Sequence, residues 1–510
     1  MPPKSLPWPW NSMLADNQPK SGDLVGFSDA ARSRHGVIFG GSGVGKSRFL
    51  ESLVVLDAIR RVTGRSKRGV VVLDVHGDLC RNIRARLAIA TRQFPELNEL
   101  LVFVDPTIKN WTVGLNPLEI RDDAVAERIA SGLADTVATI YRESAETTPR
   151  LYRIASNTFL ALALAGKTLT DLPCFLTDRL YREQMVSRLN HPELTQFWFS
   201  EFPKAGKQGD EREALAMTES TLNRLTRFIT DPDIAALFSG SSTINWRDVL
   251  DTGKIVLVSA PVGILGSGNS YLLCALILSA IEQAALSRAD VPEDRRTPVT
   301  VYADEFVRYV TSSITQIIAE GRKFGIELIL ATQETKGHLR NVELQSAVLN
   351  TVGNIMTFRL GYSDAETLVK DIFAPDLNAV KDVHYRWQKP LGIDVLYREK
   401  VYRALPEIWE TEIRKITQLP DQMMWYKRRG HPGSQLIKTL SVADIRKLPN
   451  AHELAQLLEA QEITVARRTG RVKLPRIQVQ PVQRNSSPVI PKLLGSGKDE
   501  IDESEWEPIE

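Results

Sequence analysis

The sequence predicts an α/β protein built around a mostly parallel sheet, with an all-helical insertion and a disordered C-terminal tail. Short runs of β-branched residues alternate with helical stretches, which is typical of strands covered on both faces. Between about Glu119 and Val249 these runs vanish and apolar residues recur at helical spacing, as in 123-DAVAERIASGLADTVATIY. The predicted strands are 36-GVIF, 69-GVVVLDV, 101-LVFVD, 254-KIVLVSA, 298-PVTVYAD, 326-IELILATQ and 354-NIMTFRL.

Composition narrows the class of protein. The 510 residues are 43% hydrophobic and 25% charged, which is typical of a globular chain and excludes disorder of the whole. The net charge of +2 supplies no global attraction to nucleic acid, so a binding site for it must be a local patch. Cys80, Cys174 and Cys274 are too few for a disulfide framework. The apolar run 271–286 is too short to span a bilayer, so we expect a cytoplasmic chain without an integral membrane segment.

The same patterns predict domain boundaries. The 401–464 region is mixed in character, and the tail is basic up to residue 498 and acidic from 499 to 510. The expected parts are an irregular arm (1–34), the first part of the nucleotide-binding domain (35–118), the helical insertion (119–249), the second part of the domain (250–400), the mixed region (401–464) and the tail (465–510).

The strongest motif is 40-GGSGVGKS, which matches G-x-x-x-x-G-K-[ST] and lies between a predicted strand and a predicted helix. Glycines let successive backbone N–H groups turn inward around phosphates at a helix N-terminus. Lys46 is expected to reach the β and γ phosphates of ATP, and the Ser47 hydroxyl to bind Mg²⁺. The expected nucleotide-binding residues are Gly40, Gly41, Ser42, Gly43, Val44, Gly45, Lys46 and Ser47.

Such a loop requires a carboxylate at the end of a neighbouring strand. Asp304 and Glu305 close the run 299-VTVYADEF, and we expect Asp304 to assist the metal and Glu305 to act as general base. A second polar strand end, 74-DVHGD, has three interpretations: support of the phosphate site, a structural turn or an independent metal site.

Two further residues are expected to act at the nucleotide. Gln333 ends a predicted strand and suits a sensor that hydrogen-bonds the attacking water or the γ-phosphate. Arg322, in the Arg322-Lys323 pair, lies far from its own P-loop lysine in sequence. It is either an arginine finger for a neighbouring subunit or part of a solvated helix end.

The order of these motifs resembles the HerA/FtsK superfamily of DNA-pumping ATPases, in particular the TraD/TrwB-like coupling proteins of type IV secretion. The resemblance covers roughly residues 30–400, and its motifs include GVVVLDVHGDL, 114-GLNPLE, 301-VYADEF, 320-EGRKFGIELILATQ and 358-FRLGYSDAE. It implies a RecA-like ATPase domain and a ring of six subunits with DNA in the central channel. It also implies that Arg322 acts across the subunit boundary.

The function expected from this resemblance is ATP-driven DNA translocation in a conjugative or mobile-element system. The alternatives are a nucleotide-gated adaptor that recruits a relaxase or nuclease, and a soluble HerA-like helicase. Coupling proteins usually begin with two transmembrane helices and this sequence shows none, so either a partner anchors the chain at the membrane or it works without a secretion channel.

Local patches supply the candidates for binding DNA and protein partners. The segments 60-RRVTGRSKR and 425-WYKRR are basic, and each is a candidate DNA contact or an ordinary solvated surface. The loop 261-PVGILGSGN is a candidate channel lining or a helix-entry turn. A relaxase or secretion-channel component is expected to dock on the helical insertion or on the acidic tail, whose alternative role is to keep the chain soluble.

Overall fold

We describe a computed structural model of the chain. The structure describes residues 29–108, 113–120, 123–140, 149–202, 223, 226, 229–333, 348–388, 395–431, 433–439 and 451–468. The chain divides into two compact units, Met1–Lys473 and Leu474–Glu510, and every described residue lies in the first. The acidic tail, most of the N-terminal arm and most of residues 203–228 of the helical insertion therefore lie outside the described residues.

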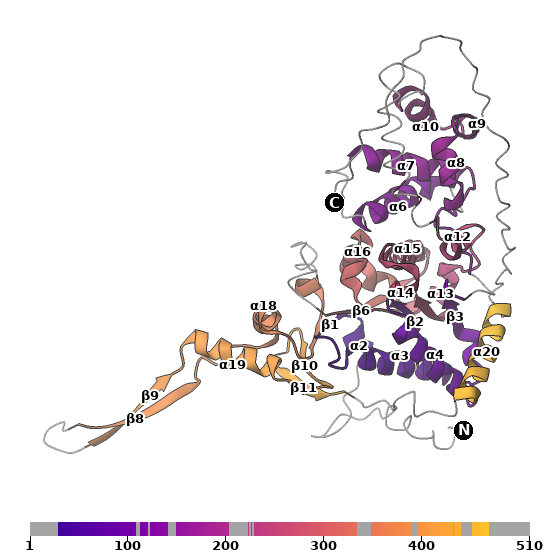
Figure 1. Cartoon of the computed structure of the whole chain (residues 1–510). Coiled ribbons are helices and arrows are strands. Elements are labelled where there is room, and N and C mark those ends of the chain that lie inside the picture. The colour runs from indigo at the N-terminus through magenta and orange to yellow at the C-terminus, as the bar shows by residue number, and fades with distance from the viewer. Residues whose placement is uncertain are drawn as a thin grey trace, which may run out of the picture. The chain divides into compact units, whose positions relative to one another are not determined.

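A nine-stranded sheet forms the centre of the first unit (Figure 1). Its order is β11-β10-β7-β1-β6-β5-β2-β4-β3, and the seven strands from β7 to β3 run parallel. All seven coincide with predicted runs, so the expected mostly parallel α/β fold is confirmed. They are β1 (Gly36–Phe39), β2 (Gly69–Asp74), β3 (Leu101–Val104), β4 (Ile255–Ser259), β5 (Val299–Ala303), β6 (Ile326–Thr332) and β7 (Asn354–Thr357).

Four strands were not predicted. β10 and β11 form an antiparallel hairpin that extends the sheet beyond β7. β8 and β9 pair antiparallel with each other in a separate two-stranded sheet. These strands are β8 (Val380–Gln388), β9 (Val395–Tyr402), β10 (Met423–Arg428) and β11 (Ser434–Lys438).

Helices cover both faces of the sheet because successive strand residues point to opposite sides. Ile38, Val70 and Val72 pack with α3 (Lys46–Val62) and α4 (Asp78–Ala90). Val37, Val71 and Leu73 pack on the other face, where Figure 1 shows α15 and α16. The remaining helices of this framework are α2 (Asp29–Arg32), α5 (Leu97–Leu100), α13 (Trp246–Thr252), α14 (Val262–Leu265), α15 (Ser267–Leu286), α16 (Ser312–Glu320), α18 (Tyr362–Ile372), α19 (Leu405–Thr417) and α20 (Ala451–Arg468).

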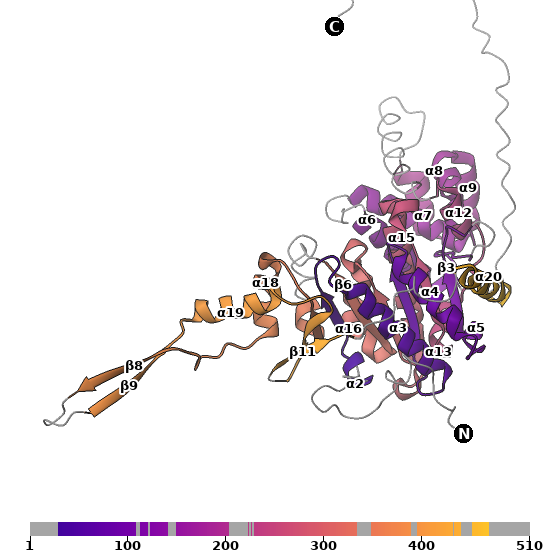
Figure 2. The same ribbon diagram turned by 60° about the horizontal axis from the view of Figure 1, so that its bottom comes forward.

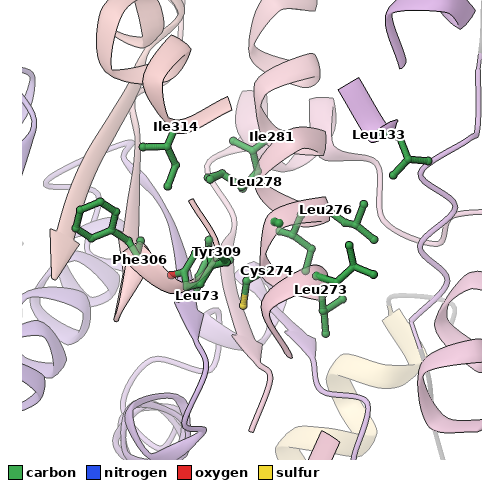
Figure 3. Packing of buried hydrophobic residues seen from close by; sticks show 14 of the residues in the cluster. Leu73, Leu133, Leu273, Cys274, Leu276, Leu278, Ile281, Phe306, Tyr309 and Ile314 are labelled. Carbon is green, nitrogen blue, oxygen red and sulfur yellow. The ribbon is translucent and has the colours of Figure 1, made fainter. Parts of the chain in front are cut away.

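Helix α15 packs against the sheet. Together with the turn that follows, as Ser267–Asp290, it is long and apolar enough to cross a membrane by length and composition, and 61% of its apolar window is buried inside the protein. Cys274 lies beside Leu73 of β2 and Tyr309, which follows β5 (Figure 3). These contacts place α15 in the core, although the helix is longer than the apolar run 271–286 that the sequence indicates.

Among its described residues, the insertion between β3 and β4 contains helices, turns and irregular segments but no strand, and its helices lie beside α15 (Figure 2). The hydrophobic residues of the insertion pack into the same core as the sheet face that α15 covers. Arg128 Nε also donates to Gln283 Oε1 of α15 at 2.9 Å. Its helices are α6 (Ala126–Ile140), α7 (Pro149–Leu164), α8 (Leu172–Thr177), α9 (Arg179–Arg188), α10 (Pro192–Gln196), the π-helical turn Phe197–Glu201 and α12 (Pro232–Phe238).

The first and last described segments of the chain are more regular than the sequence indicates. Asp29–Arg32 form a helix, and Arg32 is buried in contact with Asp57 and Tyr302. α20 continues to Arg468, past the expected start of the tail, and Val465 packs in the core beside α4.

Candidate nucleotide-binding site

The glycine-rich loop joins β1 to the N-terminus of α3, where the motif requires it. Gly45 caps α3 with φ 112°, a backbone conformation that residues with a side chain rarely adopt. A Cβ on Gly40 would lie 2.7 Å from Cβ of Phe358, so the loop packs closely against the residue after β7. The resulting turn presents backbone N–H groups at a helix N-terminus, which is an arrangement that binds phosphates.

Lys46 lies in the first turn of α3 and is buried. Its ammonium donates to the carbonyl oxygens of Gly40 at 2.6 Å and Gly41 at 2.9 Å. Burial lowers the pKa of Lys46, and the nearby carboxylates of Glu305 and Asp304 oppose that shift. The ammonium of Lys46 therefore lies against the backbone of the loop, whereas the neighbouring Ser47 is exposed.

Asp304 and Glu305 follow β5 at the same edge of the sheet, and both are buried. Asp304 is fixed through its backbone, because its N–H donates to the Leu73 carbonyl and its carbonyl accepts from the Tyr309 hydroxyl, both at 3.0 Å. Glu305 has φ 50°, in the left-handed region. Strained backbone of this kind often marks a functional residue whose surroundings hold it in place.

The Asp304 carboxyl has an unusual environment. Burial, followed by the charges of Asp74 and Glu305, raises its pKa to about 7, and Lys46 opposes the rise. Its Oδ1 is buried without a hydrogen-bond partner. A buried carboxylate oxygen without a hydrogen-bond partner is stabilised by a nearby positive charge. Asp304 and the exposed Ser47 hydroxyl therefore fit a Mg²⁺ ion bound with a nucleotide.

Asp74 ends β2, the strand next to β5. Its carboxylate accepts the backbone N–H groups of His76 and Cys80, each at 2.9 Å, and so shapes the turn into α4. His76 and Asp78 are exposed, and Asp78 pairs with Arg81. Within the part of the chain that the structure describes, no group of three or more His, Cys, Asp or Glu side chains is arranged to hold a metal. Asp74 thus supports the turn and adds negative charge beside Asp304.

Gln333 and Arg322 lie at opposite ends of β6. Gln333 directly follows this strand, which lies between β1 and β5, so its backbone is at the same edge as the P-loop and Glu305. Arg322 is exposed in the 3₁₀ turn Gly321–Phe324 that precedes the strand. The seven residues of β6 separate the two edges by roughly 20 Å, at a rise of about 3.3 Å per residue. Arg322 therefore faces away from the nucleotide site of its own chain.

Near Arg322, His35 is held in the neutral form. Its Nδ1 accepts the Leu328 N–H at 3.0 Å, and burial, followed by the charge of Arg322, lowers its pKa to about 4. Below about pH 6.5 the unfolded chain binds a proton at His35, whereas the folded chain does not until about pH 4. The free energy of unfolding therefore has its full value above about pH 6.5 and decreases as the pH falls towards 4.

We therefore expect the free energy of unfolding to fall by up to about 2 kcal/mol between pH 6.5 and pH 5 because of His35 alone. The variant His35→Gln keeps a hydrogen-bond acceptor but does not titrate, so it should lack this part of the loss. Urea unfolding of both proteins at the two pH values measures the difference. An identical pH dependence in the two proteins would show that His35 is not responsible.

Two residues at the nucleotide site were missed by sequence analysis. The Arg359 carbonyl accepts the N–H of Gly41, and the N–H of Gln422 donates to the Val44 carbonyl, both at 2.9 Å. The Arg359 side chain ties the two segments together through Asp421. Arg359 lies in the motif 358-FRLGYSDAE, but nothing in the sequence around Gln422 indicates contact with a loop nearly 380 residues away.

The basic patches prove to be partly structural. In the first patch, Arg61 donates to the Gly253 carbonyl, and Arg68 is buried in ion pairs with Glu327 and Asp29. In the second, Trp425 and Tyr426 belong to β10, and Trp425 packs edge-on against Phe373. The loop 261-PVGILGSGN contains the short helix α14 and the first turn of α15, as its helix-entry interpretation predicts.

Comparison with known proteins identifies the fold. The bacterial conjugative coupling protein TrwB, in its unbound monoclinic form, matches 82% of this chain and 88% of its own with a TM-score of 0.55 and 16% sequence identity. The chain has the fold of TrwB. The resemblance seen in the sequence is thus confirmed for the fold, including the RecA-like arrangement of the P-loop domain.

Two further TrwB structures carry nucleotides. The complex with the GTP analogue GDPNP has a TM-score of 0.54 and 17% identity, and the complex with ADP and Mg²⁺ has a TM-score of 0.52 and 16% identity. Each covers 82% of this chain and 88–89% of its own. No match was found among protein-family models or among curated proteins.

Proposed function

We propose that this protein is an ATP-driven DNA translocase of a conjugative or mobile-element system. The observation that carries the proposal is the convergence of the P-loop, the buried pair Asp304–Glu305 and Gln333 at one edge of the sheet. The TrwB fold and the nucleotide complexes of TrwB support it.

In this proposal the P-loop amides and Lys46 bind the phosphates of ATP. Ser47 and Asp304 would hold a Mg²⁺ ion, which when bound would supply positive charge next to the phosphates. Glu305 accepts the proton of the attacking water, and Gln333 hydrogen-bonds the water or the γ-phosphate. Because Lys46 is buried, its positive charge acts strongly on the reacting phosphate.

The proposal includes a ring of identical subunits, of six as in hexameric relatives, with Arg322 completing the site of a neighbour. The position of Arg322 at the far edge of its own sheet supports this, since it leaves only another chain's nucleotide within reach. We further propose that the ring works in the cytoplasm, where a relaxase or secretion-channel component recruits it through the helical insertion or the acidic tail.

ATP hydrolysis measured with and without DNA tests the function. We expect DNA of any sequence to stimulate turnover, and DNA binding to weaken about tenfold or more between low and physiological salt, because phosphate contacts release counterions. Lys46→Ala is the control, since it removes the cation on the phosphates and should abolish both basal and stimulated turnover. Turnover that no DNA changes at any salt concentration would instead favour a nucleotide-gated adaptor.

A further inference from the structure

β8 and β9 form a two-stranded ribbon (Figures 1 and 2). The register of the two strands gives this ribbon two faces that carry different residues. Side chains alternate along a strand, and residues directly opposite each other in the register share a face. Tyr385 lies opposite Arg398, Trp387 opposite Leu396 and Val383 opposite Lys400, so these six residues form one face, called here the aromatic–basic face. This face combines two aromatic rings with two cations.

The aromatic–basic face is open to solvent. Trp387 is 69% exposed and Tyr385 is 61% exposed, and Arg398 and Lys400 are also exposed. Leu396 is also exposed, so three large apolar side chains lie together on this face, and contiguous exposed apolar patches mark interaction sites. Among the described side chains of the ribbon, none on this face is acidic.

On the opposite face, each described acidic side chain lies near a basic or titratable side chain. Arg386 Nε lies 3.7 Å from Glu399 Oε2, and His384 Nε2 lies 3.7 Å from Asp382 Oδ2. The described acidic residues of the ribbon are thus all on that side, where each is close to a basic or titratable group. The segregation leaves positive charge on the aromatic–basic face only, which complements a polyanion.

We infer that the aromatic–basic face binds single-stranded nucleic acid, with bases stacked on Tyr385 and Trp387 and phosphates paired with Arg398 and Lys400. Sequence-tolerant binding of single strands uses this combination of stacking platforms and cations. The two rings stand on alternate residues of one strand, about 6.6 Å apart along the backbone, which is about twice the stacking height of a base. Tyrosine, tryptophan and arginine are also enriched at protein interfaces, so a second copy of this chain is the competing occupant that the experiment has to exclude.

Helix α19 connects the ribbon to the segment that contacts the P-loop. Arg403 N–H donates to the Ala379 carbonyl and closes the base of the ribbon, and Lys381 pairs with Glu407 in the first turn of α19. α19 ends at Thr417, and five residues later Gln422 contacts the P-loop through Val44. The contact with the ribbon and the contact with the P-loop therefore lie at opposite ends of α19.

The inference rests on the proposed function and is tested with the full-length chain. Binding of a labelled single-stranded oligonucleotide and of the same sequence as a duplex is measured by fluorescence anisotropy for the double variant Tyr385→Ser/Trp387→Ser. We expect single-strand binding to weaken about tenfold or more and duplex binding to weaken less, because paired bases cannot stack on the rings. Leu377→Ser, which removes a side chain 67% exposed just before the ribbon, is the control and should change neither.

A second pair of variants tests the cations. Arg398→Gln/Lys400→Gln should reduce the slope of log affinity against log salt concentration by about 1.4, at about 0.7 for each phosphate contact of a single strand. Arg386→Gln removes one positive charge from the opposite face and should leave the slope unchanged. Thermal unfolding of every variant shows that the fold is retained.

The outcomes separate this inference from the proposed function. If the wild-type chain binds single strands and both double variants bind equally well, the ribbon is not the binding surface, whereas the translocase proposal stands. If the double variants keep DNA binding but change the oligomeric state, the face is a contact between copies of the chain and the inference is wrong. If the wild-type chain binds no DNA at all, the proposed function and this inference fail together.

Discussion

Replacing Glu305 with glutamine is expected to lower ATP turnover by about 10²–10⁴-fold while ATP still binds. Glutamine has the same shape and fits the buried position, but it cannot accept the proton of the attacking water. Turnover and the affinity for a fluorescent ATP analogue are measured in parallel, because the loss should be confined to the chemical step.

The control for this variant is Glu293→Gln, which neutralises an exposed carboxylate in the turn before β5. It should hydrolyse ATP like the wild-type chain. Near-normal turnover by Glu305→Gln would contradict the assignment of Glu305 as the base. Loss of ATP binding would show instead that Glu305 shapes the loop, as its left-handed backbone allows.

Arg322→Ala is expected to bind ATP normally and to hydrolyse it about 10³-fold more slowly. A cation delivered to the γ-phosphate stabilises the transition state far more than bound ATP, so its loss lowers turnover rather than affinity. Lys323→Ala is a matched control, because Lys323 is the adjacent exposed cation in the same 3₁₀ turn. Equal turnover of the two variants would leave Arg322 as part of a solvated surface.

The parallel strands and the motif residues could be predicted because their signals are local. Runs such as 69-GVVVLD are buried on both faces, and such strands are continuously apolar. The P-loop and Asp304–Glu305 follow strand ends, and parallel strands bring those ends to one edge of the sheet. The prediction of the fold therefore also placed most of the candidate site.

The four remaining strands lack that local signal. β8 and β9 are rich in polar and charged residues, and none of their described side chains is buried. β10 carries Lys427 and Arg428 at the end of the sheet beyond β7. The contact of Gln422 with the P-loop depends on how the C-terminal hairpin returns across the sheet, which no nearby residue encodes. Long-range packing decides these features.

The central claim is that each nucleotide site is completed by a neighbouring chain, and mixing two inactive variants tests it most directly. Chains with Glu305→Gln still carry Arg322, and chains with Arg322→Ala still carry Glu305, so some interfaces of a mixed assembly contain both residues. Turnover is measured on the mixture after co-assembly has been verified with two distinguishable tags. The account predicts partial recovery of ATP hydrolysis above either parent. A mixture that co-assembles and stays as inactive as its parents, or a wild-type chain that is fully active as a monomer, would contradict it.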